Sequence, residues 1–211
     1  QWSQKYIGQY FNSTEGRKLL IRATFQQAKE DGVTVLEIGE DVWGLKEFFH
    51  NDIDELVESF TSAQREIAPE IELRLQIGLS RHCPISYLED CLSYFWGNKN
   101  FYSIDLYGDE FAQPIENFKG IYRRAKKEGL RLKAHVGEWG TAKDIRTAVE
   151  ELELDEVQHG IAAAGDESVI RFLAENKIRL NITPTSNVLL GRVADMAEHP
   201  IGKLYRSGID V

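Results

Sequence analysis

The feature that most constrains this chain is the alternation of apolar strand patterns with amphipathic helical patterns. Strand candidates recur at 33–38, 72–77, 102–106, 130–136, 156–159 and 177–183. Apolar residues at helical spacing lie between them, at 52–65, 115–127, 141–152 and 166–175, and Pro200 suits the first turn of a last helix through Leu204. Strands that alternate with helices are typical of βα units around a parallel sheet. The pattern predicts an α/β fold, and we expect a single domain over residues 1–211.

Two parallel architectures fit this alternation: an open sheet of six strands, and a TIM barrel. Strands that helices cover on both faces read as nearly continuous apolar runs, but several strands here alternate. Asp105 lies between Ile104 and Leu106, and the strands at 130–136 and 177–183 alternate in the same way. One face of each strand therefore packs on helices while the other presents polar groups. This favours a parallel (β/α)8 TIM barrel, whose polar residues converge on one axis and in part form buried ion pairs.

The length and the ends of the chain bear on how much of the barrel is present. A complete (β/α)8 barrel takes roughly 250 residues, whereas this chain has 211. It begins with Gln1 rather than Met, and Ile-Asp-Val at 209–211 follows Gly208 with the pattern of a strand start. We therefore expect an incomplete barrel with about six to seven strands, lacking its first strand and its end.

Composition limits the class of partner. The chain has 25 Lys and Arg against 34 Asp and Glu, for a net charge of −9, which argues against nucleic-acid binding but not against a small nucleoside. No apolar run approaches the roughly 20 residues that a membrane span needs. The two cysteines, Cys83 and Cys91, suit free thiols in a reducing compartment, so we expect a cytoplasmic protein.

Polar residues gather where the expected strands end, which is where barrel enzymes place catalytic groups. His135 has the inward parity of its strand, and neutral imidazole is the commonest metal ligand. Glu138 follows Gly137, which can bend the chain and return the carboxylate to the pocket, where it could move protons beside a metal. His159 ends the next strand. Asp105 and Gly108 lie at an earlier strand end, and the segment 183–187 lies at a later one.

Each of these residues also has an ordinary structural interpretation. A lone His is more often a hydrogen-bonded core residue than a ligand. Asp109 and Glu110 could form a solvated loop edge or cap the next helix, and the segment 183–186 fits turn chemistry alone. We assign His50, His82 and His199 to structural positions.

Taken in order, the segments resemble the adenosine deaminase family of amidohydrolase barrels. The resemblance covers roughly residue 72 to the C-terminus, and it is the order of five motifs that makes it specific. These motifs are 103–110 (strand four), Lys133–Glu138 (strand five, His-Ala-Gly-Glu), 158–160 (strand six, His-Gly), 183–187 with 190–191 (strand seven), and 198–211 (the helix leading into strand eight).

The resemblance implies zinc-dependent hydrolytic deamination of adenosine or a related adenine-containing nucleoside or nucleotide, with one zinc ion per intact enzyme. By the family's pattern, His135 would be a zinc ligand. Glu138 would protonate the purine nitrogen beside the amino-bearing carbon, and His159 would orient and help deprotonate the water that the zinc binds. Substrate contacts would come from the Gly108 amide, from Asp105 in support, and from Ser186 and Asn187.

Several positions depart from the family pattern, and these departures leave alternative functions open. The family's strand-one His-x-His pair and its Asp pair after strand eight are not among these 211 residues. One family ligand is present, where catalytic zinc takes about three, so we expect the isolated chain to be inactive. Val136 replaces the usual Ala, Tyr107 replaces a small residue, and Trp139 could cap the site. Another metal-dependent amidohydrolase on the same barrel, or a non-catalytic homologue, is the alternative function.

Overall fold

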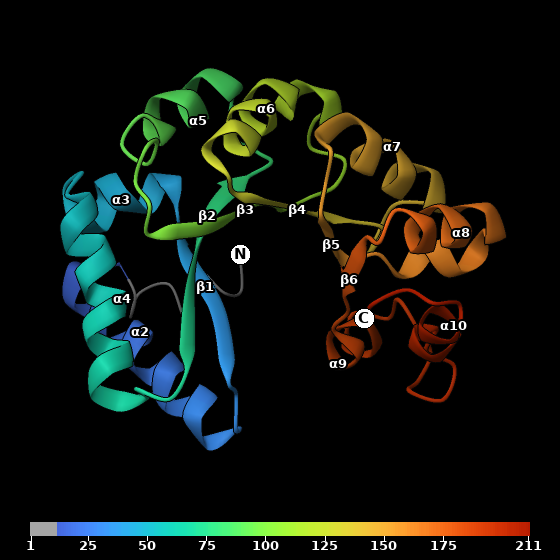
Figure 1. The fold of residues 1–211 in the computed structure, drawn as a ribbon, viewed down its shortest axis with the longest axis horizontal. Helices are drawn as coiled ribbons and strands as arrows, with labels where there is room; N and C mark the ends of the chain where they lie inside the picture. Colours follow the sequence, from blue (N-terminus) through green and yellow to red (C-terminus); the bar gives the residue numbers. More distant parts are fainter. Residues whose placement is uncertain (1–11) are drawn as a thin grey trace. The chain divides into compact units, whose positions relative to one another are not determined.

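The computed structural model describes residues 12–211, which include six strands and the helices that follow them (Figure 1). The strands are β1 (Val35–Asp41), β2 (Glu72–Ser80), β3 (Phe101–Tyr107), β4 (Arg131–Val136), β5 (Glu156–His159) and β6 (Arg179–Asn181). The helices are α2 (Thr14–Glu30), α3 (Val42–Phe49), α4 (Ile53–Ile67), α5 (Ile85–Leu92), α6 (Lys119–Glu128), α7 (Ala142–Leu152), α8 (Glu167–Glu175), α9 (Pro184–Leu189) and α10 (Ile201–Arg206), with 3₁₀ turns η2 (Ile115–Phe118) and η3 (Ile161–Gly165). All six expected strands are present.

The chain divides into two compact units, the first made of Gln1–Gly78 and Ser86–Tyr102, the second of Leu79–Ile85 and Ser103–Val211. In the first unit, β1 and β2 run parallel, from Val35 opposite Glu72 to Asp41 opposite Gly78. Helix α2, which the sequence pattern does not predict, packs on α4. The single domain expected over the whole chain stays a prediction.

In the second unit, β3, β4, β5 and β6 pair in parallel and in sequence order. Figure 1 shows α6, α7 and α8 along one side of these strands. Helix α7, at the helical pattern expected over 141–152, begins with a capping box that Thr141 forms with Asp144. The apolar residues of β4 are buried, as are Ile145 and Leu152 on α7. The alternation seen in the sequence thus separates a helix-packed face from a polar face.

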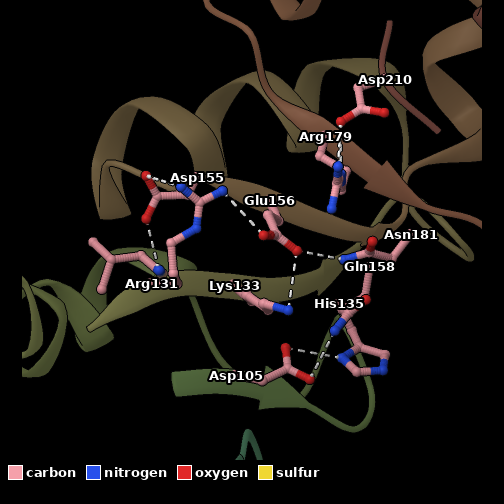
Figure 2. Close-up of polar contacts among 11 residues, drawn as sticks. Asp105, Arg131, Lys133, His135, Asp155, Glu156, Gln158, Arg179, Asn181 and Asp210 are labelled. Atoms are coloured by element: carbon pink, nitrogen blue, oxygen red, sulfur yellow. Dashed lines mark hydrogen bonds and ion pairs between the residues drawn. The ribbon is translucent and has the colours of Figure 1, made fainter. Parts of the chain in front are cut away.

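The polar face of these strands carries a buried ion pair, as the sequence predicts (Figure 2). Lys133 Nζ lies 3.0 Å from Glu156 Oε2, and both side chains are nearly inaccessible. Asn181 donates to the same carboxylate at 2.9 Å and Arg131 at 3.0 Å. Burial by itself would raise the pKa of Glu156, but the hydrogen bonds from Asn181 and Lys133 and the charge of Lys133 outweigh it and lower the pKa to about 2.

Replacing Glu156 by Gln is expected to cost about 3 kcal/mol of unfolding free energy at neutral pH, since Lys133 would stay buried without its carboxylate. The pKa of Glu156 falls from 4.5 in the unfolded chain to about 2, a shift worth roughly 3 kcal/mol. That stabilisation is complete above about pH 5 and is lost as the pH falls toward about 2. Urea unfolding across this range should show a flatter pH profile for the variant.

Glu150→Gln, which breaks an exposed pair with Arg146, is the control and should change stability by less than about 0.5 kcal/mol. Equal pH slopes for wild type and Glu156→Gln would contradict the prediction.

The C-terminal part of the second unit differs from the expectation in two places. The strand expected at 177–183 is shorter, and helix α9 begins at Pro184, where turn chemistry was one expectation. The strand start expected at 209–211 is wrong as a regular strand: a single backbone hydrogen bond, from Leu180 N–H to the Asp210 carbonyl at 2.9 Å, joins this segment to β6. Within residues 12–211, no helix has the length and apolar character that crossing a membrane requires.

Candidate active site

The side chains of His135, Glu138 and His159 lie together at the carboxyl ends of β4 and β5. The imidazole centroids of His135 and His159 are 5.3 Å apart, and His159 Nδ1 lies 3.5 Å from Glu138 Oε1. Parallel pairing explains this, because His159 lies opposite Val136, the residue after His135. Gly137 then turns the chain with a φ of 76°, which brings the next residue back toward the strand ends.

The Gly137 position leaves no room for a side chain. A Cβ added there would lie 2.4 Å from Ile145 Cδ1, and the positive φ is unfavourable for any other residue. Gly137→Ala is therefore expected to destabilise the protein by about 2 kcal/mol in urea unfolding. Gly120→Ala, in α6 with open space around the added methyl, is the matched control and should be neutral or stabilising by up to about 1 kcal/mol. Equal stability of the two variants would contradict this reading of the turn.

His135 is held by a carboxylate on the neighbouring strand (Figure 2). Its Nδ1 lies 3.3 Å from Oδ1 of Asp105, whose residue is buried, and Gln158 Nε2 donates to Oδ2 of the same carboxylate at 3.3 Å. Burial lowers the pKa of His135, but the hydrogen bond and the charge of Asp105 outweigh it, so the pKa rises above 6.5. With Nδ1 engaged by Asp105, Nε2 is the ring nitrogen left for a metal, the usual pattern of a ligating His.

One carboxyl oxygen of Glu138 has a hydrogen-bond partner, and the other has none among residues 12–211. Oε2 accepts a hydrogen bond from the Trp139 indole at 3.0 Å. Oε1 is buried and has no hydrogen-bond partner among residues 12–211. A buried polar atom without a partner costs about 1–3 kcal/mol, so such an atom marks a place where a ligand or water completes the contacts.

His159 combines a strained backbone with a shielded ring. Its φ is 66°, which is uncommon for a residue other than glycine, and its Nδ1 lies 3.2 Å from Thr183 Oγ1. Burial lowers the pKa of His159 below 6.5, against the opposing charge of Glu138. The imidazole is therefore neutral at physiological pH, the form that can accept a proton.

Gly108 lies at the end of β3 with a φ of 104°. A Cβ there would lie 3.2 Å from the His82 ring, and the N–H of Asp109 approaches His82 Nε2 at 3.4 Å. His82, for which the sequence predicts only a structural position, thus contacts the segment expected to bind the purine. Gly108 also borders an open hollow of about 340 Å³ with Asp109, Phe111 and Trp139.

Ser186 and Asn187 lie on α9, and within residues 12–211 the Asn187 side chain faces His199. Asn187 is fully buried, and its Oδ1 lies 3.1 Å from His199 Nε2, while its Nδ2 has no hydrogen-bond partner within that range. Burial lowers the pKa of His199, and its Nδ1 accepts the N–H of Ile201 at the start of α10. Asn187 thus ties α9 to the segment before α10.

Two residues to which the sequence assigns no role in the site contact the Glu138 loop; one of them, Glu110, is buried and not the solvated loop edge that was one expectation. Glu110 accepts hydrogen bonds from the backbone of the loop. Arg192 donates from Nε to the Glu138 carbonyl at 2.7 Å, and its guanidinium lies 4.5 Å from the Trp139 ring centroid. The nearness of Glu110 to Gly108 was the only available signal, and nothing local in the sequence indicates Arg192.

The residues present fit part of a metal site. Within residues 12–211 no three His, Cys, Asp or Glu side chains are grouped as metal ligands. His135 has the carboxylate-held imidazole of a ligand, and the unpartnered Oε1 of Glu138 lies near His159 beside it. His135 could hold a metal, and Glu138 and His159 could move protons, so further ligands would have to come from residues outside this set.

Known proteins resemble this chain along most of its length. It is 38% identical over 192 residues to a candidate adenosine/adenine deaminase of Treponema pallidum (strain Nichols), covering 91% of this chain and 64% of that protein. It is 29% identical over 222 residues to the adenine deaminase of Rhodopseudomonas palustris (strain BisB18), covering 99% and 63%. The chain thus spans less than two thirds of these relatives.

Solved structures with a similar fold include a protein of the same kind. The crystal structure of adenine deaminase from Arthrobacter aurescens matches with a TM-score of 0.80 at 24% identity, over 93% of this chain and 61% of that one. This confirms the parallel (β/α) TIM-barrel class, present in part. The family model described as adenosine deaminase matches residues 5–211. The chain therefore belongs to the adenosine deaminase family of the amidohydrolase superfamily.

Proposed function

We propose that this chain supplies the acid, the base and one metal ligand for hydrolytic deamination of an adenine-containing base, nucleoside or nucleotide. One observation carries the proposal: His135, Glu138 and His159 meet at adjacent strand ends, and the buried Glu138 Oε1 has no hydrogen-bond partner among residues 12–211. The names of the relatives, adenine and adenosine deaminases, support the same chemistry.

Each residue of the site would have a different role in the reaction. Water adds across the ring C=N bond, so its oxygen bonds to the amino-bearing carbon and the neighbouring ring nitrogen must gain a proton. The C–N bond then breaks: the proton that the base took from water would pass to the amino group, which leaves as ammonia, and the remaining hydroxyl proton would return to the acid as the ring carbonyl forms. Glu138, protonated on Oε1, would donate the proton to the ring nitrogen, and His159 at 3.5 Å from this oxygen would orient the attacking water and accept its proton. The N–H of Gly108 would bind the purine, and Asp105 would hold His135 in place.

In this arrangement zinc would bind Nε2 of His135, because Asp105 orients the imidazole ring through Nδ1. When bound, zinc would lower the pKa of a water ligand to about 7 and so provide the nucleophile at neutral pH. The solved amidohydrolase from Burkholderia ambifaria, with a TM-score of 0.79 and 21% identity over 94% of this chain and 57% of that one, has bound Zn. That observation, with the oriented imidazole, supports zinc as the metal.

We propose further that the 211 residues alone bind zinc weakly and turn over no substrate. The chain spans 64% and 63% of the two relatives described above. Catalytic zinc takes about three protein ligands, and His135 is one. The remaining ligands would then lie in the part of the barrel that these residues do not include.

The test compares the full-length zinc-loaded protein with the 211-residue chain on adenine, adenosine, AMP and N6-methyl-AMP, by ammonia release and by the oxo-purine product. We expect turnover of at least one compound by the full-length protein and none by the 211-residue chain. Failure of the full-length protein on all four would overturn the deaminase proposal. Hydrolysis of another cyclic amide in place of these compounds would establish the alternative amidohydrolase.

A further inference from the structure

Glu110 is a buried carboxylate to which the proposed chemistry assigns no role. It follows β3, is 7% exposed, and accepts four backbone N–H groups from the loop between β4 and α7. Oε2 accepts from Gly137 at 2.7 Å and from Gly140 at 3.3 Å, while Oε1 accepts from Glu138 at 2.9 Å and from Trp139 at 2.8 Å. Consecutive N–H groups that point at one anion form a strong, directional binding site.

The segment that carries Glu110 is itself anchored within the second unit. The Gln113 side chain donates from Nε2 to the carbonyl oxygens of Arg81 at 2.6 Å and Cys83 at 2.8 Å. In return, buried Arg81 donates from Nε to the Gln113 carbonyl at 3.0 Å. Glu110 therefore contacts the Glu138 loop from a segment that hydrogen bonds to Arg81 and Cys83 hold in place.

The Glu138 loop depends on this carboxylate for its shape. The four N–H groups precede α7 and have no other acceptor among residues 12–211, so they would be left unpaired without Glu110. Two further contacts restrain the loop: the Gly137 carbonyl accepts the N–H of Ala162 at 3.0 Å, and Arg192 binds the Glu138 carbonyl and stacks on Trp139. Neither of them engages the N–H of Glu138 itself, which Glu110 binds.

We propose that Glu110 is a positioning residue, whose carboxylate places the Glu138 side chain by binding the N–H groups of the loop that carries it. The inference rests on the deaminase function proposed above. Gly108 lies two residues before Glu110, so the same carboxylate also links the amide proposed to bind the purine to the acid proposed to protonate it. A displacement of about 1 Å at such a group can cost about 100-fold in rate.

The decisive variant is Glu110→Gln in the full-length zinc-loaded protein. Its amide NH2 would face N–H donors, so two of the four hydrogen bonds are lost while the side chain keeps its size. We expect kcat to fall about 100-fold with KM and zinc content little changed, since the contact places a group used in the transition state. Hydrogen exchange at the amides of residues 137–140 should become faster. Glu110→Asp keeps the charge with a shorter reach and should fall between the variant and the wild type.

Asp166→Asn is the matched control, because Asp166 also accepts backbone N–H groups, those of Ser168 and Val169 at the start of α8. It should lower stability without changing kcat or exchange at 137–140. Unchanged kcat in Glu110→Gln despite faster exchange would overturn the positioning role, and unchanged exchange would overturn the loop restraint. If Glu110→Gln does not fold, Glu110→Asp carries the same two measurements. If the wild type deaminates nothing, the proposed function fails, and hydrogen exchange still decides whether Glu110 holds the loop.

Discussion

Replacing Glu138 by Gln is expected to lower kcat on the adenine-containing substrate by about 1000-fold, with KM changed only a few-fold. General acid catalysis contributes about 10²- to 10⁴-fold, and the Gln amide has no acidic proton to give the purine ring nitrogen. The variant keeps the shape of the side chain and an oxygen for the Trp139 indole, which donates to Oε2 at 3.0 Å. Steady-state kinetics of the full-length zinc-loaded protein measure the effect.

The control for this variant is Glu150→Gln, on the exposed face of α7, which should leave kcat unchanged. Zinc content should be unchanged as well, because Glu138 is proposed to transfer a proton and not to bind the metal. A Glu138→Gln enzyme that keeps more than a tenth of wild-type kcat would remove Glu138 as the acid. Loss of zinc from the same variant would instead make Glu138 a ligand.

Replacing His135 by Ala is expected to abolish zinc binding and deamination together. Mutation of a group that only orients a ligand costs about 10- to 100-fold in metal affinity, and loss of the ligand itself should exceed that range. Asp105→Asn should fall within the range, since it weakens the 3.3 Å contact that holds His135 Nδ1. Competition against a zinc-binding dye gives the affinities, and elemental analysis gives the zinc content of the purified proteins.

His50→Asn is the control for this series. His50 is exposed, lies in the first unit and has a left-handed φ of 53°, which Asn tolerates. It should keep the zinc content and kcat of the wild type. Wild-type zinc affinity in His135→Ala would show that the imidazole is not a ligand, whatever happens to activity.

Strand positions could be predicted from the sequence because apolar and polar residues alternate along segments such as β4, although both faces of that strand are largely buried in the structure. Helix starts were predictable where a capping residue is present, as at Thr141 and Asp166. Helix α2 was not anticipated because its buried residues, Ile21, Phe25 and Ala28, form a narrow stripe on an otherwise polar segment. Its packing on α4, and not its own periodicity, defines it.

The sequence by itself determined which strand ends carry His135, Glu138 and His159, since side-chain parity and parallel pairing place successive strand ends along one edge. Only the tertiary structure decided which acceptor binds the N–H groups of the 137–140 loop, and that Asn187 faces His199. These contacts join loops that have no repeating pattern, so the partner of each polar group depends on backbone conformations fixed by long-range packing. A sequence read alone shows where a carboxylate such as Glu110 occurs, but not which backbone groups it meets.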